Sequence, residues 1–182
     1  MSPLPSFLAY LLALTVLVAA IYDLRFRRIP NWLSVSALVA ALAYRLFSGG
    51  WTELKSGLAG FGIAFGVYFL FYLIRAMRAG DVKLMAAVGA ISGFPNWYPL
   101  FILTSALGGI VALIVVVYKG RLKQTLSNVS FILWEIAHLK KPFEAKPALD
   151  AGSVSAVTLP HGFAVALGSL LFLLLSSLPA AK

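Results

Sequence analysis

The sequence predicts an all-α polytopic membrane protein, a six-helix transmembrane bundle with a cytoplasmic amphipathic segment. Of the 182 residues, 61% are hydrophobic and 12% are charged, whereas a soluble domain carries about 25% charged residues. The mean hydropathy is +0.93, and several apolar runs approach the ~20 residues that a helix needs to cross a bilayer. The length suits one transmembrane domain, residues 1–182, and leaves no room for a second, water-soluble one.

Six apolar runs are expected to span the membrane, at about residues 5–22, 30–47, 54–74, 82–94, 97–118 and 159–178. The first has no basic residue before it and no small-residue cleavage site ahead of Asp23, so a removable signal peptide fits poorly. The fourth run is short for a span and ends at Gly93-Phe94-Pro95. The third run contains small residues that let membrane helices approach closely: Gly57, Gly60, Gly62 and Gly66.

The positive charges predict the orientation of these spans, because Lys and Arg concentrate in short cytoplasmic loops. One side of the six predicted spans carries Arg25, Arg27, Arg28, Arg75, Arg78, Lys83, Lys119, Arg121, Lys123, Lys140, Lys141 and Lys146. The other side carries Arg45, Lys55 and Lys182. Both termini are therefore expected outside the cytoplasm.

The connection at 119–158 is expected in the cytoplasm and divides into two parts. Its first half has apolar residues at helical spacing, namely Leu122, Leu126, Val129, Leu133 and Ile136. This pattern fits an amphipathic helix on the inner leaflet, and equally a helix packed on the bundle. The second half, 142–157, is rich in Pro, Ala, Gly and Ser and is expected to be a flexible connector.

Composition also argues against several classes of function. The net charge of +9 suits cytoplasmic loops better than a nucleic-acid surface, and no nucleic-acid partner is expected. The chain has no cysteine and two histidines, so neither a metal site nor a cofactor is expected. The His-Glu-x-x-His motif of metalloproteases, a Gly-x-Ser-x-Gly site and a phosphate-binding P-loop are all missing from the sequence.

Two of the six carboxylates stand out. Solvated roles suffice for Glu53, Glu135, Glu144 and Asp150. Asp23 ends the first predicted span and Asp81 begins the fourth. Two crossings separate them, so both return to the same face of the membrane.

A carboxylate at the edge of the hydrocarbon is costly and marks a candidate functional site. If two share a site, repulsion leaves one protonated and the other ionised. The ionised group can take a proton from a water attacking a peptide carbonyl, while the protonated one stabilises the oxyanion. Structural roles compete with this hypothesis: Asp23 could pair with Arg25 or Arg27, and Asp81 could be a helix N-cap.

The segments around both aspartates resemble the type IV prepilin peptidases, GxGD-type intramembrane aspartic peptidases. Asp23-Leu24-Arg25-Phe26-Arg27-Arg28-Ile29-Pro30-Asn31 is similar to the first catalytic motif, and Arg78-Ala79-Gly80-Asp81-Val82-Lys83-Leu84 to the second. Leu159 to Gly168 is similar to the Pro-x-Gly segment that opens the last helix of the family. The resemblance covers essentially the whole chain. One departure is Arg78, which stands where the second motif has its first glycine.

The resemblance implies a catalytic Asp23–Asp81 dyad that removes the short leader of prepilins or pseudopilins at the cytoplasmic boundary of the bacterial inner membrane. The chain has neither the length nor the cysteines of the N-terminal methyltransferase domain of larger members. It resembles the short, peptidase-only form of Flp/Tad-type pilus systems, so no N-methyltransferase activity is expected. The oligomeric state is not predicted.

Four residues of the two motifs are candidates for supporting the site. Gly80 is interpreted as conformational, and Pro30 begins the second predicted span. Asn31 either begins a helix or hydrogen-bonds substrate or the Asp23 loop. Lys83 lies about 200° around a helix from Asp81, so it either extends to the interface or tunes the charge of the aspartate.

One alternative comes from a different functional class. The chain could be a non-catalytic scaffold or transporter component of a pilus or secretion assembly, with structural or proton-carrying acids. A carrier could tolerate the loss of one aspartate, whereas a catalytic dyad could not.

Overall fold

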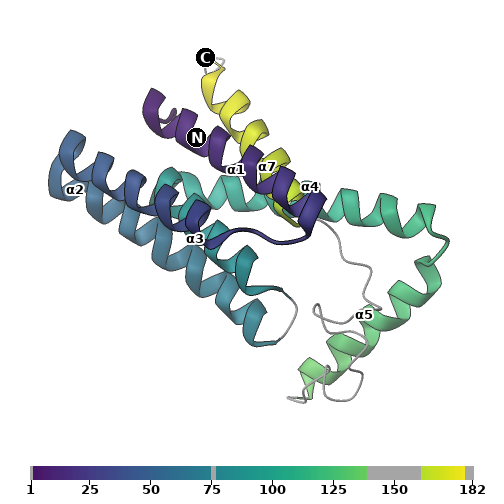
Figure 1. Ribbon diagram of the computed structural model, residues 1–182. Helices are drawn as coiled ribbons and strands as arrows, with labels where there is room; N and C mark the ends of the chain where they lie inside the picture. Colours follow the sequence, from purple (N-terminus) through teal and green to yellow (C-terminus); the bar gives the residue numbers. More distant parts are fainter. Residues whose placement is uncertain (1, 75–76, 139–160, 179–182) are drawn as a thin grey trace.

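The computed structural model describes residues 2–74, 77–138 and 161–178. Within these ranges the chain forms six helices (Figure 1). They are α1 (Ser6–Phe26), α2 (Asn31–Leu73), α3 (Ala79–Ser92), α4 (Phe94–Tyr118), α5 (Leu122–Ala137) and α7 (His161–Ser177). The predicted all-helical fold is thus confirmed for the described part of the chain.

Three of these helices, α1, α2 and α4, are long and apolar enough to cross a membrane. Helix α7 is also apolar but has only 17 residues. Helix α3 has 14 residues, about 21 Å of helix, which is shorter than the ~30 Å hydrocarbon core of a bilayer. The long apolar helices suit a membrane protein, and the arrangement of six spans stays a prediction.

Helix α2 folds back on itself at Gly50, which has a left-handed backbone (φ 64°, ψ −152°). A Cβ placed on Gly57 would lie 2.7 Å from the Arg45 side chain and 3.1 Å from that of Leu42. In a straight helix, residues 42 and 57 would be about 22 Å apart. Figure 1 accordingly shows two arms of α2 side by side. These arms, 31–49 and 51–73, match the second and third predicted spans.

The expected loop between those spans was wrong. The sequence predicted non-helical chain at 48–53, but only Gly50 leaves the helical conformation. Glycine adopts a positive φ at little cost, so a single residue suffices for the reversal. Glu53, expected in this loop, is therefore a helical residue at the start of the second arm.

One glycine pair, Gly60 and Gly89, lets α2 and α3 approach closely, and these two helices share the most extensive interface among the described helices. A Cβ on Gly60 would overlap the carbonyl oxygen of Gly89, and a Cβ on Gly89 would overlap that of Gly60. Gly62 and Gly66 have open space where a Cβ would be. The close helix approach expected from the glycines of this segment therefore holds for Gly57 and Gly60, and not for the other two.

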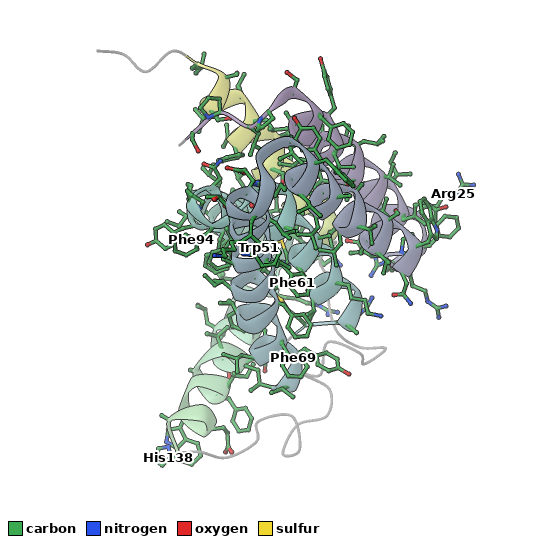
Figure 2. All side chains as sticks on the ribbon, turned by 90° about the vertical axis from the view of Figure 1, so that its left-hand side faces the viewer. Arg25, Trp51, Phe61, Phe69, Phe94 and His138 are labelled. Atoms are coloured by element: carbon green, nitrogen blue, oxygen red, sulfur yellow. The ribbon has the colours of Figure 1, made fainter. Side chains whose placement is uncertain are left out.

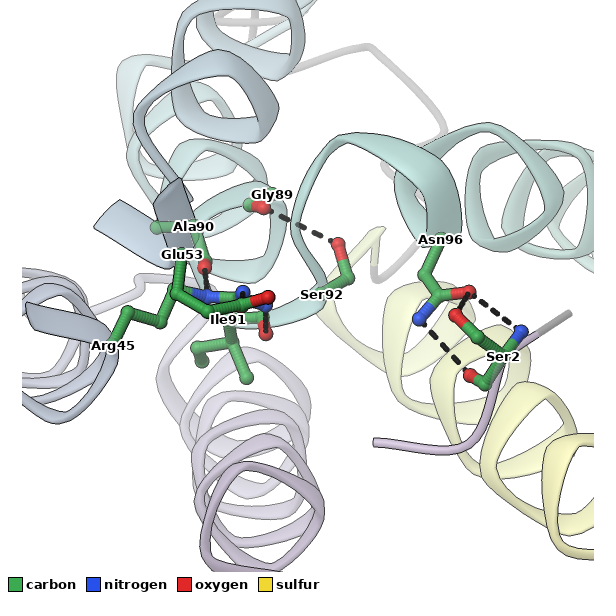
Figure 3. Close-up of polar contacts among 8 residues, drawn as sticks. All are labelled: Ser2, Arg45, Glu53, Gly89, Ala90, Ile91, Ser92 and Asn96. Atoms are coloured by element: carbon green, nitrogen blue, oxygen red, sulfur yellow. Dashed lines mark hydrogen bonds and ion pairs between the residues drawn. The ribbon is translucent and has the colours of Figure 1, made fainter. Parts of the chain in front are cut away.

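Arg45 was counted among the positive charges of the non-cytoplasmic side, and the structure gives it a further role inside α2. Its side chain is buried at 3% exposure, with Nε donating to the Ala90 carbonyl at 3.0 Å and Nη2 to that of Ile91 at 2.9 Å (Figure 3). These carbonyls belong to the last turn of α3, where the helix itself leaves C=O groups unsatisfied. Glu53, for which a solvated role was expected, pairs with the same guanidinium while about half of its side chain stays exposed.

Helix α4 packs with its first half and extends away from the bundle with its second (Figure 1). Its buried residues all lie in the first half: Asn96, Trp97, Leu100 and Thr104. Asn96 also holds the N-terminal segment, since its side-chain amide exchanges hydrogen bonds with Ser2 (Figure 3).

Helix α5 confirms the helical part of the amphipathic prediction, and Figure 2 shows His138 at its far end, away from the bundle. Leu122, Leu126 and Val129 are exposed, so these apolar side chains are not covered by the bundle. Glu135 is 7% exposed, and its expected solvated role was wrong. The proposed connector at 142–157 lies outside the described residues.

The helix crossing leads to a stability prediction. Gly60→Ala is expected to lower the free energy of unfolding by about 1–3 kcal/mol, because its methyl would meet backbone atoms that cannot rotate away. Thermal unfolding of the purified protein in detergent measures the change. The matched control, Gly62→Ala, adds the same methyl in open space and should leave stability unchanged or slightly raised. Equal effects of the two substitutions would contradict the glycine crossing.

Candidate active site

Asp23 lies in the last turn of α1 and is buried, with 8% of its surface exposed. Its Oδ2 accepts a hydrogen bond from the Gly162 backbone N–H at 2.7 Å. Gly162 is the second residue of α7, whose first N–H groups have no partner within the helix. The positive end of the α7 dipole therefore faces this carboxylate and stabilises a negative charge there.

This contact depends on the residue at position 162 being glycine. A Cβ on Gly162 would lie 3.0 Å from the Asp23 Cβ, 3.1 Å from its Oδ2 and 3.3 Å from the Ala19 carbonyl oxygen. All three distances are tighter than ordinary contacts, so a side chain here would push α7 away from α1. Glycine lets the N-terminus of α7 reach Asp23.

Asp81 is the third residue of α3 and is 9% exposed. Its Oδ2 accepts a hydrogen bond from the backbone N–H of Arg78, the N-cap residue, at 3.3 Å. The carboxylate thus occupies the acidic position of a capping box. The expected helix-start role is present, but the N-cap position itself belongs to Arg78.

The two aspartates lie at the same end of the bundle. Asp81 interacts electrostatically with Asp23, and also with His161 and Arg78. The competing partners expected for Asp23 are elsewhere: the Arg25 guanidinium lies 5.6 Å from the ring of Phe26 and points away from the bundle (Figure 2). Within the described ranges, neither Arg25 nor Arg27 forms an ion pair with Asp23. The structure therefore brings the two sequence-predicted carboxylates together.

Two aromatic residues beside Asp81 were missed by the sequence analysis. Tyr68, from the second arm of α2, is 1% exposed and interacts electrostatically with Asp81. Its ring packs on that of His161 with 5.8 Å between centroids. Among the described residues, the buried His161 Nε2 has no hydrogen-bond partner. Tyr68 carried no signal, because it lies in a continuous apolar run.

Arg78 forms a further contact between the two aspartate-bearing segments. Its backbone is extended (φ −91°, ψ 152°), a conformation open to any residue, so no glycine is required there. Its Nη1 donates to the Arg27 carbonyl at 3.1 Å. Arg27 follows α1 in the left-handed conformation (φ 52°), and among the described residues it is the one non-glycine with a positive φ.

The four support candidates lie at the edge of the site. Lys83 donates from Nζ to Asn31 Oδ1 at 3.0 Å on an exposed surface, away from the buried Asp81. Pro30 is the N-cap of α2. A Cβ on Gly80 would lie 3.4 Å from the Ile29 side chain, an ordinary contact, and Gly80 has no positive φ. These residues join the starts of α2 and α3.

Among the residues that the structure describes, no group of three His, Cys, Asp or Glu side chains could hold a metal ion.

Comparison with known proteins identifies the family. The model of the type IV leader peptidase family matches residues 10–113, a segment that includes both aspartates and Arg78. The chain belongs to this family. His161 and Gly162 lie outside the segment that the family model matches. The family model therefore says nothing about their contacts with the aspartates, which come from the structure.

The names of the curated relatives combine two activities, a leader peptidase and an N-methyltransferase. The chain is 29% identical over 126 residues to the Prepilin leader peptidase/N-methyltransferase of Escherichia coli strain K12, covering 65% of this chain and 54% of the relative. It is 25% identical over 167 residues to the protein of the same name in Burkholderia pseudomallei strain 1026b, covering 88% and 48%. The chain thus spans about half the length of these relatives. No solved structure matches it significantly.

The contact between α7 and Asp23 leads to a second prediction. Gly162→Ala should lower the unfolding temperature, by an amount equivalent to about 1–3 kcal/mol, since the methyl has no room beside Asp23. Gly80→Ala is the matched control, because its methyl would make only ordinary contacts. Thermal unfolding in detergent compares the two. If Gly162→Ala proved as stable as Gly80→Ala, α7 would not approach Asp23 this closely.

Proposed function

We propose that this protein is an intramembrane aspartic endopeptidase that removes the short leader of Flp-like type IV prepilins. One observation carries the proposal: two buried carboxylates from separate motifs, Asp23 and Asp81, interact at one end of an apolar helical bundle. Membership of the leader peptidase family supports the reaction class. The names of the curated relatives support prepilins as substrates.

In the proposed reaction, the aspartates share one proton and act on a bound water. The ionised carboxylate takes a proton from the water as its oxygen attacks the carbonyl carbon of the scissile peptide bond. The protonated carboxyl donates to the developing oxyanion. When the tetrahedral intermediate collapses, the C–N bond breaks and the proton taken from water passes to the leaving amine. Water thereby supplies OH to one product and H to the other.

The environment of the aspartates supports a dyad over two separate structural acids. Like charges in a buried site repel each other, so a shared proton is the stable arrangement. The Gly162 N–H at Asp23 and the Arg78 N–H at Asp81 provide donors that hold both carboxyl groups in place. Lys83 and Asn31 form their own exposed bond, and we assign them to the joining of α2 and α3 and not to proton transfer.

We further propose that the site faces the cytoplasm in the bacterial inner membrane, with both termini on the other side. The Lys and Arg residues gather at the ends of α1 and α4, near the start of α3 and in the 119–158 connection, as the positive-inside rule requires of a cytoplasmic face. This placement suits a reaction at the boundary between a basic leader and a hydrophobic substrate helix.

The dyad is tested by cleavage of a co-expressed Flp-type prepilin, followed as a shift in pilin mass. Asp23→Asn and Asp81→Asn should each lower the cleavage rate by about 10³-fold or more, because removing one member of a catalytic unit disables the whole. Asp150→Asn, which removes a carboxylate outside both motifs, is the control and should cleave as wild type does.

Each result separates the proposal from the scaffold or transporter alternative. Both variants must be present in the membrane at wild-type levels for a loss of cleavage to count. Cleavage that survives either substitution would remove the dyad, and absence of cleavage by the wild type would favour the non-catalytic alternative.

Orientation is tested with single cysteines, since the chain contains none. Arg28→Cys, next to the Asp23 segment, should react with a membrane-impermeant maleimide only after the cytoplasmic side is opened. Lys55→Cys, in the second arm of α2 near Gly50, should react from outside. The reverse pattern would place the aspartates on the non-cytoplasmic face.

A further inference from the structure

Three hydrogen bonds link the Asp81 carboxylate, through Arg78 and Arg27, to the backbone of Asp23, and Arg78 is the central residue. The backbone N–H of Arg78 donates to Asp81 Oδ2 at 3.3 Å. Its guanidinium Nη1 donates to the Arg27 carbonyl at 3.1 Å. The Arg27 N–H in turn donates to the Asp23 carbonyl at 2.9 Å. One residue therefore contacts both the second motif and the end of the first.

The packing of the helices shows why a hydrogen bond between the end of α1 and the start of α3 matters. Helix α1 packs mainly on α7, and α2 packs mainly on α3, whereas direct contacts of α1 with α2 and α3 are much less extensive. Asp23 belongs to the α1–α7 pair and Asp81 to the α2–α3 pair. The distance between the two carboxylates therefore depends on contacts between the α1–α7 pair and the α2–α3 pair. The Arg78–Arg27 bond is one of these contacts, and its two residues lie within four positions of Asp81 and Asp23.

The chemistry of this contact suits arginine. Carbonyls at the end of a helix lack partners within it, and the partial negative charge there attracts a cation. Arg27 lies at this end of α1, in a left-handed conformation that costs energy for a non-glycine residue. A guanidinium offers a planar set of donors on a long side chain, so Arg78 can cap α1 while its backbone caps α3.

We propose that Arg78 is a positioning residue that sets the separation and orientation of Asp23 and Asp81. It does so by linking the end of α1 to the start of α3 through the Arg27 carbonyl. This inference rests on the proposed peptidase function. It gives a role to the residue at which the second motif of this chain departs from the pattern it resembles.

The first test is the kinetics of prepilin cleavage in detergent by the wild type, Arg78→Ala and Arg78→Lys. Arg78→Ala should lower kcat by roughly tenfold or more, the factor expected when a hydrogen bond from a charged donor is lost. KM should stay within about twofold of wild type, because no contact with substrate is removed. Arg78→Lys keeps a charged donor without the planar fork, and its kcat should lie between the other two.

The matched control is Arg121→Ala, which removes one exposed arginine outside both motifs. It should leave both kcat and KM unchanged. Equal losses in Arg121→Ala and Arg78→Ala would reduce the effect to surface charge and overturn the proposal. A wild-type kcat in Arg78→Ala, or a rise in KM alone, would overturn it as well.

The second test does not depend on activity. Spin labels on Phe26→Cys and Ala79→Cys, two exposed positions flanking the bond, report the distance between the end of α1 and the start of α3. Arg78→Ala should broaden or lengthen this distance distribution, and Arg121→Ala should not. An unchanged distribution would overturn the positioning role even if wild type cleaved prepilin. If wild type failed to cleave, the proposed function would fail while this distance still tested Arg78.

Discussion

The fold must keep two carboxylates buried in a chain that is 61% hydrophobic. An isolated ionised group in such surroundings is strongly destabilising unless it has donors and compensating charge. Both aspartates receive them from helix N-termini: Asp23 from Gly162 at the start of α7, and Asp81 from the first turn of its own helix. Helices α1, α3 and α7 must therefore meet at one point, and this requirement fixes how their ends are arranged.

Helix α3 is held by charge at both of its ends. At its N-terminus lies Asp81, and at its C-terminus the buried Arg45 donates to the Ala90 and Ile91 carbonyls. An acid at the start and a cation at the end both complement the helix dipole. Gly93 makes room for this arrangement, since a Cβ there would lie 2.7 Å from the guanidinium. Helix α3, which packs on α2 through glycines, is thereby held at both ends, and this fixes the position of Asp81.

Sequence reasoning found the parts of this arrangement that periodicity and chain reversal determine. Two crossings were expected between Asp23 and Asp81, and the hairpin at Gly50 returns the chain to the end of the bundle where Asp23 lies. The sequence did not reveal Arg45 or Tyr68, because their roles depend on partners from other helices. Arg45 was counted only as a positive charge of one side before the α3 carbonyls beside it were seen. Likewise, only the structure placed His161 beside the Tyr68 ring and near Asp81.

Stability and alignment of the site depend on different contacts. The close approach of Gly60 and Gly89 lies inside the α2–α3 pair, so it determines whether that pair forms, but not where Asp23 stands relative to it. The first half of helix α4 packs on the bundle, where α4 contacts both α2 and α7 and so joins the two pairs. At the level of the aspartates, the Arg78 bond to Arg27 connects α3 directly to the end of α1. A change in this bond can alter the spacing of the carboxylates while the core of each pair stays intact.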